Sequence, residues 1–235
     1  VPKSASVATF KSVLGYGKWT WLSSTILIFN AHTDKWIVSA ILGLKVFGYY
    51  SIGVSVLNQL KTIFTSSVSW IFPKISSGKL SDKEKASMHL KLTLFASLIG
   101  LVTSFVLVKI DFFFLMWLGK ETFENSKLFL HLFLFLLPVW LISSASFYYL
   151  LGLGIVKKKF YADLFVFLTK ITVTFVALLK LDYERWPILF VIPIMIELLL
   201  FTVLVHQKSK LKLLYVALFV LFNLLVLTLR FNNIL

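Results

Sequence analysis

The feature of this sequence that most constrains its fold is a series of apolar runs, each long enough to cross a lipid bilayer. Seven candidate spans lie at about 18–43, 47–72, 88–109, 127–151, 160–181, 186–206 and 211–229. Lipid offers no hydrogen bonds to an open backbone, so each run is predicted to be a helix. We therefore expect an all-α polytopic transmembrane bundle in which residues 1–235 form one helical lobe.

Composition and charge agree with an integral membrane protein. Hydrophobic residues make up 59% of the chain, and the mean hydropathy is +0.90. The net charge of +14 could attract nucleic acid, but the lysines fall between apolar runs, as they do in juxtamembrane loops. We expect membrane lipids around the protein and no nucleic-acid partner. The sequence contains no Cys, which excludes disulfides and thiolate metal sites within it.

Lysine and arginine are unevenly divided between the two sides of the predicted bundle. Alternate loops carry 14 of these residues on the side of the amino terminus and 7 on the other side, and the remaining 3 lie inside spans. Cytoplasmic loops of membrane proteins are enriched in Lys and Arg. The count therefore predicts a cytoplasmic amino terminus and, with seven spans, an outer carboxyl terminus.

Two consecutive spans carry a charge near their centres, where a membrane helix usually has none. Asp34 lies at membrane depth in the first span, and Lys61 lies near the middle of the second. Charged residues inside a bilayer are costly, so they normally face a bundle interior or a wet cavity. A polar stripe with helical spacing surrounds Lys61: Ser51, Ser55, Asn58, Thr62, Thr65 and Ser69.

The sequence leaves two interpretations of these charges open. Asp34 could bind a proton, a cation or a polar substrate group, or it could be a structural carboxylate paired with His32, Lys35 or Lys61. Lys61 could bind a phosphate or pyrophosphate as a point charge, or it could neutralise a neighbouring acid. The polar stripe could line a substrate path, or it could pack against another helix through its small residues.

Three further residues join the candidate site for a substrate or an ion. Asn30 lies one turn before Asp34 and could share its ligand. Lys170 lies well inside the fifth span, and Glu197 is central in the sixth. Asp163, two turns before Lys170, is instead expected to be a solvated residue at the cytoplasmic end of its helix.

Local patterns predict where some helices begin and end. The segment 73–78 is expected to stop the second helix, and Ser81 with Glu84 forms a capping box that starts the third. The segment 112–118 is too short to cross a bilayer and is expected at the membrane interface. Two prolines fall inside spans and are expected to kink them: Pro138 and Pro193.

No pattern in the sequence supports an enzyme. There is no Gly-rich phosphate-binding loop, no set of His and Cys with metal-ligand spacing, and no H-E-x-x-H. The longest predicted outer loop, roughly 109–127, is short and has no array of Arg or His. We expect no catalytic residue, no cofactor and no metal site.

Four stretches of the sequence resemble a known family, in the family's order. They are D-K-W-I-V-S-A-I-L-G-L-K-V-F-G-Y-Y-S (34–51), F-P-K-I-S (72–76), F-F-F-L-M-W-L-G (112–119) and Y-L-L-G-L-G-I-V-K-K-K (149–159). The resemblance covers about residues 10–205. It is to the polysaccharide and O-antigen flippases of the multidrug, oligosaccharidyl-lipid and polysaccharide exporter superfamily. The most specific pattern is the first, an Asp inside a span followed about fourteen residues later by Gly-Tyr-Tyr.

The resemblance implies an architecture and a function. Members have two six-helix lobes around a central cavity, so this chain would be the carboxyl-terminal lobe with one extra helix and would lack its amino-terminal partner lobe. The absence of an initiator Met agrees with that. The implied function is the alternating-access transport of an undecaprenyl-pyrophosphate-linked oligosaccharide across the bacterial cytoplasmic (inner) membrane for surface polysaccharide biosynthesis. Asp34 and Lys61 would then meet the sugar-pyrophosphate head.

Two other classes of protein stay open. A cation-coupled multidrug exporter of the same superfamily would favour acidic and aromatic residues in its cavity. A membrane glycan polymerase or acyltransferase would need a catalytic Arg or His array in a long outer loop. Transport of a lipid-linked sugar, as against a cationic drug, distinguishes the first alternative from the flippase.

Overall fold

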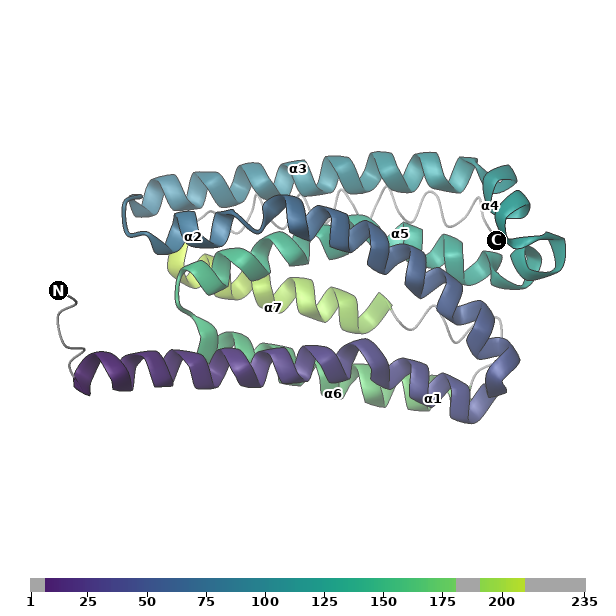
Figure 1. Ribbon diagram of the computed structural model, residues 1–235, viewed down its shortest axis with the longest axis horizontal. Helices are drawn as coiled ribbons and strands as arrows, with labels where there is room; N and C mark the ends of the chain where they lie inside the picture. Colours follow the sequence, from purple (N-terminus) through teal and green to yellow (C-terminus); the bar gives the residue numbers. More distant parts are fainter. Residues whose placement is uncertain (1–6, 181–190, 210–235) are drawn as a thin grey trace, which may run out of the picture.

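The computed structural model describes residues 7–180 and 191–209, and every element within them is a helix. The helices are α1 (Val7–Val68), α2 (Ile71–Ser76), α3 (Asp82–Lys109), α4 (Asp111–Leu118), α5 (Lys120–Gly152), α6 (Val156–Lys180) and α7 (Val191–Ser209). The long helices run side by side along one direction (Figure 1). The predicted all-helical bundle is confirmed. The last predicted span, 211–229, and the start of the sixth, 186–190, lie outside the described residues.

Four of the described helices are long and apolar enough to cross a membrane. They cover Val13–Ser76, Asp82–Lys109, Lys120–Gly152 and Val156–Leu179, and a shorter apolar helix covers Val191–Gln207. The first of them is bent into two arms. Each arm is long enough to cross a membrane, because even the shorter one, with 25 residues after the bend, is about 37 Å long. The fold therefore fits a multi-pass membrane protein.

The bend in α1 occurs at Gly43. Its φ of 80° and ψ of 171° lie outside the helical region, and glycine adopts such a conformation without steric cost. A straight helix of 62 residues would be about 93 Å long, far more than a bilayer core of about 30 Å. The bend instead gives a first arm (7–42) and a second arm (44–68) that returns toward the end of the bundle where α1 begins (Figure 1).

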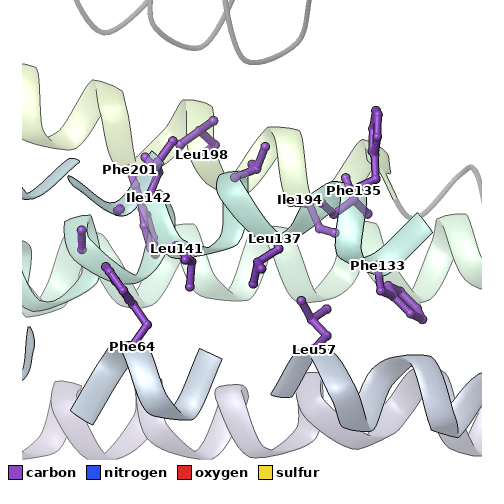
Figure 2. Close-up of a cluster of buried hydrophobic side chains, with 14 of the residues drawn as sticks. Leu57, Phe64, Phe133, Phe135, Leu137, Leu141, Ile142, Ile194, Leu198 and Phe201 are labelled. Carbon is purple, nitrogen blue, oxygen red and sulfur yellow. The ribbon is translucent and has the colours of Figure 1, made fainter. Parts of the chain in front are cut away.

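The central helix of the bundle is α5, which is buried along most of its length. Figure 2 shows its side chains between the second arm of α1 and α7. The core cluster there includes Leu57 and Phe64 from α1, Leu137, Leu141 and Ile142 from α5, and Ile194, Leu198 and Phe201 from α7. A helix that is apolar on every side can be buried among other helices or face lipid, and α5 is buried among them.

The helix α3 approaches α5 closely at Gly100. A Cβ atom on Gly100 would lie 2.6 Å from the Cα atom of Pro138. Pro138 lies inside α5, and the helix continues through it as one element. The missing side chain of Gly100 is therefore what allows the two backbones to meet at this point.

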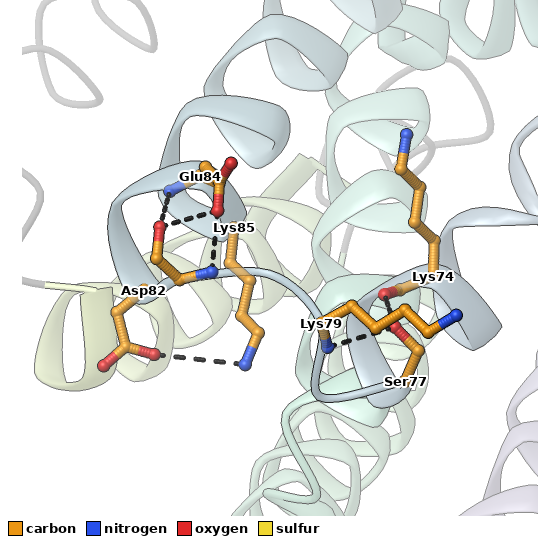
Figure 3. A network of polar contacts seen from close by, with 7 residues as sticks. Lys74, Ser77, Lys79, Asp82, Glu84 and Lys85 are labelled. Carbon is orange, nitrogen blue, oxygen red and sulfur yellow. Dashed lines mark hydrogen bonds and ion pairs between the residues drawn. The ribbon is translucent and has the colours of Figure 1, made fainter.

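The loop before α3 shows how the helix ends are built (Figure 3). Ser81 caps α3, because its hydroxyl accepts a hydrogen bond from the backbone N–H of Glu84, while the Glu84 carboxylate accepts one from the Ser81 N–H at 2.8 Å. The predicted capping box is thus confirmed.

The second predicted helix stops earlier than expected, at Val68, and Pro73 lies inside α2 as its third residue. A proline in the first turn removes no helix hydrogen bond, so it does not act as a stop there.

The short helix α4 lies at the opposite end of the bundle. Asp111 ties it to α5, with its Oδ2 3.0 Å from Lys127 Nζ and its Oδ1 2.9 Å from His131 Nε2. Phe114 is buried, whereas four large apolar side chains are exposed: Phe112, Phe113, Met116 and Trp117. An aromatic, exposed face on so short a helix agrees with the predicted position at the membrane interface.

The segments that the lysine count assigns to one side of the membrane lie at one end of the bundle. The start of α1, the loop between α2 and α3, and the turn between α5 and α6 are together at the left in Figure 1. The bend of α1 and α4 are together at the right. The helix arrangement therefore places these two groups of segments at opposite ends of the bundle.

Candidate functional site

A cavity of about 250 Å³ lies between the two arms of α1 and the helices α5, α6 and α7. All five candidate binding residues line it: Asn30, Asp34, Lys61, Lys170 and Glu197. Ten other residues complete its lining: Leu27, Ala31, Tyr50, Val54, Asn58, Phe133, Trp140, Val166, Pro193 and Ile194. The convergence of the five residues on one cavity is a finding, and their role in binding stays a prediction.

Asp34 is held by partners from two other parts of the chain. Its Oδ1 lies 3.0 Å from Nζ of Lys170 on α6, and the hydroxyl of Tyr50 on the second arm donates a hydrogen bond to its Oδ2. Only 5% of Asp34 is exposed. Burial of a carboxylate is costly unless it is paired and hydrogen-bonded, and here both conditions are met. The partner comes from a distant helix and is none of the three residues proposed from sequence.

The residues beside Asp34 on the first arm point elsewhere. His32 is exposed, and its ring stacks on Trp36 with 6.3 Å between the centroids. Lys35 is half-buried and forms no ion pair within 4.0 Å of a described carboxylate. Neither residue therefore supplies the charge that balances Asp34.

Lys170 binds a second oxygen on the first arm. Its Nζ donates to the main-chain carbonyl of Asn30 at 2.6 Å. The side-chain oxygen of Asn30, Oδ1, is buried and has no hydrogen-bond partner among the described residues. Lys170 thus connects α6 to one turn of α1 through Asp34 and Asn30.

Lys61 reaches the cavity beside an aromatic ring. Its Nζ lies 5.4 Å from the centroid of Trp140, whose ring is stacked nearly parallel to that of Phe133. A cation within about 6 Å of an indole face is attracted to it. Among the described residues no carboxylate forms an ion pair with Lys61 within 4.0 Å, but Glu197 lines the same cavity and lies within electrostatic range of Lys61. The alternative in which Lys61 neutralises an acid therefore stays a prediction, with Glu197 as the acid.

Glu197 enters the cavity from α7. It is half-buried and makes neither a hydrogen bond nor an ion pair with any residue that the structure describes. Pro193, which also lines the cavity, is the third residue of α7, and the helix continues past it to Ser209. The carboxylate is thus left available to a ligand or a proton.

The polar stripe of the second arm mostly faces away from the rest of the bundle. Four of its six residues are exposed: Ser55, Asn58, Thr62 and Ser69. Its hydroxyls bond back to their own helix, as when Thr62 Oγ1 donates to the carbonyl of Asn58 at 2.8 Å. Asn58 is the member of the stripe that lines the cavity. Within the described part of the chain, the stripe is therefore not a helix-packing surface.

A second buried charge pair lies closer to the lysine-rich end. Lys159 Nζ is 2.5 Å from Asp163 Oδ2, and the hydroxyl of Ser23 donates to the same oxygen at 2.7 Å. Lys159 has no exposed surface, and Asp163 is 5% exposed. The expectation of a solvated Asp163 is wrong, because α6 packs this turn against the first arm and not against water. Lys159, one of the lysines assigned to a loop, is likewise inside the bundle.

The charges of the cavity divide into a satisfied pair and two available groups. Asp34 and Lys170 neutralise each other, whereas Lys61 and Glu197 act on each other across the cavity without a direct ion pair. Lys61 can therefore receive an anion, and Glu197 a cation or a proton. The ring of Trp140 and the amide of Asn58 add a stacking surface and hydrogen bonds. At about 250 Å³ the cavity is smaller than the roughly 300–1,000 Å³ of sites for drug-sized ligands, so it suits a phosphate or a single sugar ring.

Sequence reasoning missed two residues of this site. Tyr50 donates a hydrogen bond to Asp34. It is the second tyrosine of the Gly-Tyr-Tyr motif, so the sequence did contain a pattern that could have pointed to it. Trp140 lies in a long apolar run of α5, where an aromatic residue is ordinary, so no sequence signal distinguishes it.

One known family matches this chain. A family model described as polysaccharide biosynthesis protein matches residues 2–124, just over half of the chain. The chain belongs to this family. The match includes Asn30, Asp34 and Lys61, whereas Lys170 and Glu197 lie beyond it. Searches among curated proteins and among solved structures found no match. The resemblance noted from sequence is thus confirmed as membership of a polysaccharide biosynthesis family.

Proposed function

We propose that this polysaccharide biosynthesis protein is a flippase. It would move an undecaprenyl-pyrophosphate-linked oligosaccharide from the cytoplasmic to the outer leaflet of the bacterial inner membrane by alternating access, without acting as an enzyme. The observation that carries this proposal is Lys61, a cation that lines a cavity of a multi-pass protein and has no described carboxylate within 4.0 Å.

The chemistry of the cavity suits the head of such a lipid. A lysine binds phosphate as a point charge, and Lys61 needs to break no ion pair within the described structure to do so. Trp140 and Asn58 present an aromatic face and an amide beside it, which suit the apolar face and the hydroxyls of a sugar. The polyprenyl tail can stay in the lipid, so the protein has to shelter only the polar head.

The exposed polar stripe supports a further part of the proposal, that a second lobe faces this one. A cavity of about 250 Å³ cannot enclose an oligosaccharide, so a larger path is needed. The stripe on the second arm runs away from the cavity along a helix of membrane length and is open in this chain. An amino-terminal lobe placed against it would complete a hydrated path lined with hydroxyls.

The test compares Lys61→Ala with Lys61→Arg in the complete protein, in cells that lack the native copy. Export of surface glycan is expected to fall at least about tenfold for Lys61→Ala, the loss of one good charge contact, and to be largely kept by Lys61→Arg. Lys35→Ala is the matched control, because Lys35 is another lysine inside a predicted span but does not line the cavity. Accumulation of lipid-linked glycan in the inner leaflet identifies transport as the failing step.

Normal surface glycan from Lys61→Ala, at normal protein level, would overturn the proposal. A multidrug exporter predicts a different pattern. In that case Glu197→Gln should abolish the efflux of a cationic dye, while Lys61→Ala should preserve it.

A further inference from the structure

The ammonium of Lys170 occupies a position surrounded by oxygen atoms from the first arm of α1. It lies 3.0 Å from Asp34 Oδ1 and donates to the main-chain carbonyl of Asn30 at 2.6 Å. The side chain of Asn30 contributes a buried Oδ1 that has no partner within the described residues. The hydroxyl of Tyr50 holds the other carboxylate oxygen of Asp34 in place.

We propose that these oxygens form a binding site for a small monovalent cation, and that the ammonium of Lys170 fills this site as a tethered cation. The inference goes beyond the proposed flippase function, because it concerns the ligand of Asp34 and requires no glycan. A carboxylate, a main-chain carbonyl and a side-chain amide oxygen are the donors that hard cations take in proteins. An ammonium also has three N–H groups, and two oxygens of the first arm lie within hydrogen-bonding distance of this one.

The charge of the site favours a monovalent cation over a divalent one. The site holds one carboxylate, so one positive charge neutralises it. Calcium would in addition require six to eight oxygen ligands.

The proposal has a consequence for the ion requirement of the protein. While Lys170 is in place, the site is occupied from within, so the folded state needs no particular alkali cation. Removing the ammonium should convert the same oxygens into a site that a free cation can enter. A simple structural ion pair makes no such prediction, because its loss would depend on ionic strength and not on the size of the cation.

The experiment measures the thermal unfolding midpoint of the full chain in lipid nanodiscs, for Lys170→Ala and for the wild type. Ammonium, potassium and sodium chloride are compared with tetramethylammonium chloride at equal ionic strength, since tetramethylammonium carries the same charge but is too large for the site. At least one compact cation is expected to raise the midpoint of Lys170→Ala by about 2–4 °C over tetramethylammonium. The wild type, whose site already holds the Lys170 ammonium, is expected to lack this increment, and a response that both chains share would come from another carboxylate such as Glu197.

Three control variants separate a cation site from general electrostatics. Lys170→Arg keeps a tethered charge and should stay insensitive to the choice of cation. Lys35→Ala removes a lysine of the same arm that neither lines the cavity nor pairs with a described carboxylate, and it should also stay insensitive. The double variant Asp34→Asn with Lys170→Ala should lose the cation-dependent rise in midpoint that Lys170→Ala shows, because the carboxylate is then absent.

Equal midpoints of Lys170→Ala in all four salts would overturn the proposal. Lys170→Gln, which keeps most of the stem and one donor, is carried through the same series in case the alanine variant does not accumulate. If both variants fail to fold in every salt, the proposal is also overturned, because a compact cation in the empty site should restore them. A failed flippase assay would leave these results unaffected.

Discussion

Lys159 and Asp163, one turn apart on α6, form an ion pair of 2.5 Å in which neither side chain has more than 3% of its surface exposed. The hydroxyl of Ser23 on the first arm donates to the same carboxylate oxygen at 2.7 Å. The Lys159 ammonium also lies 4.1 Å from the ring centroid of Phe147 on α5. One buried pair therefore joins three helices close to the lysine-rich end of the bundle.

Replacing Lys159 should destabilise the protein far more than replacing the lysine beside it. Lys159→Ala leaves the carboxylate of Asp163 buried without a cation, which costs about 3–5 kcal/mol of unfolding free energy. Lys158→Ala is the matched control, because Lys158 is exposed and donates only to Gln207, at 3.1 Å. Yield and the unfolding midpoint in detergent measure the difference. Equal midpoints for the two variants would show that the pair contributes nothing.

The charged residues of the cavity could be found from sequence, but their pairing could not. Asp34, Lys61, Lys170 and Glu197 each interrupt an apolar run, and an ionisable residue in such a place is a functional candidate by default. Which of them meet depends on how α6 packs against α1 and how α7 packs against α5 and α6. The helix α1 ends at Val68 and α6 begins only at Val156. Helical periodicity says nothing about that contact.

The error over Asp163 has a related cause. Its distance from the end of the predicted span and its neighbours Lys157 and Lys158 are typical of a solvated helix end. Burial there is decided by Phe147 and Phe201, which cover Lys159 from two other helices. The capping box at Ser81 was predicted correctly, because the residues that form it are close together in sequence.

A methyl group at Gly100 should weaken the packing of α3 on α5. A Cβ there would lie 2.6 Å from the Cα of Pro138, a contact that only a backbone shift can relieve. Gly100→Ala is expected to lower the unfolding free energy by about 1–3 kcal/mol, the usual cost of overpacking. Gly48→Ala is the control, because a Cβ atom on that helical glycine would meet nothing within 4 Å and alanine favours helix. A Gly100→Ala variant as stable as Gly48→Ala would contradict the tight contact.

Acid should loosen the attachment of α4 to α5. Burial raises the pKa of Asp111, but hydrogen bonds from His131 and Lys127 outweigh that effect, so the pKa lies below its ordinary value. Because the folded-state pKa is depressed, the contact stabilises the protein above the unfolded-state pKa of about 3.9 and is lost as the pH falls through the folded-state value. The unfolding midpoint should therefore drop below about pH 4.

The variant Asp111→Asn tests the origin of that drop. It lacks the titrating group, so its midpoint should start lower and change less between about pH 6 and pH 3 than that of the wild type. Glu124→Gln removes an exposed carboxylate near the start of α5, at the same end of the bundle as Asp111, and should leave the wild-type pH profile unchanged. Parallel profiles for the wild type and Asp111→Asn would assign the acid sensitivity to other groups.

The orientation of the bundle can be tested with two single cysteines, because the sequence itself contains none. Ser77 is exposed in the loop at the lysine-rich end, and Glu124 is exposed at the opposite end, near the start of α5. If the lysine-rich end is cytoplasmic, an impermeant thiol reagent applied to intact cells should label Glu124→Cys and not Ser77→Cys. Permeabilised cells should show labelling of both, which confirms that each thiol is accessible. Labelling of Ser77→Cys in intact cells would invert the proposed topology, and with it the leaflet from which a substrate enters.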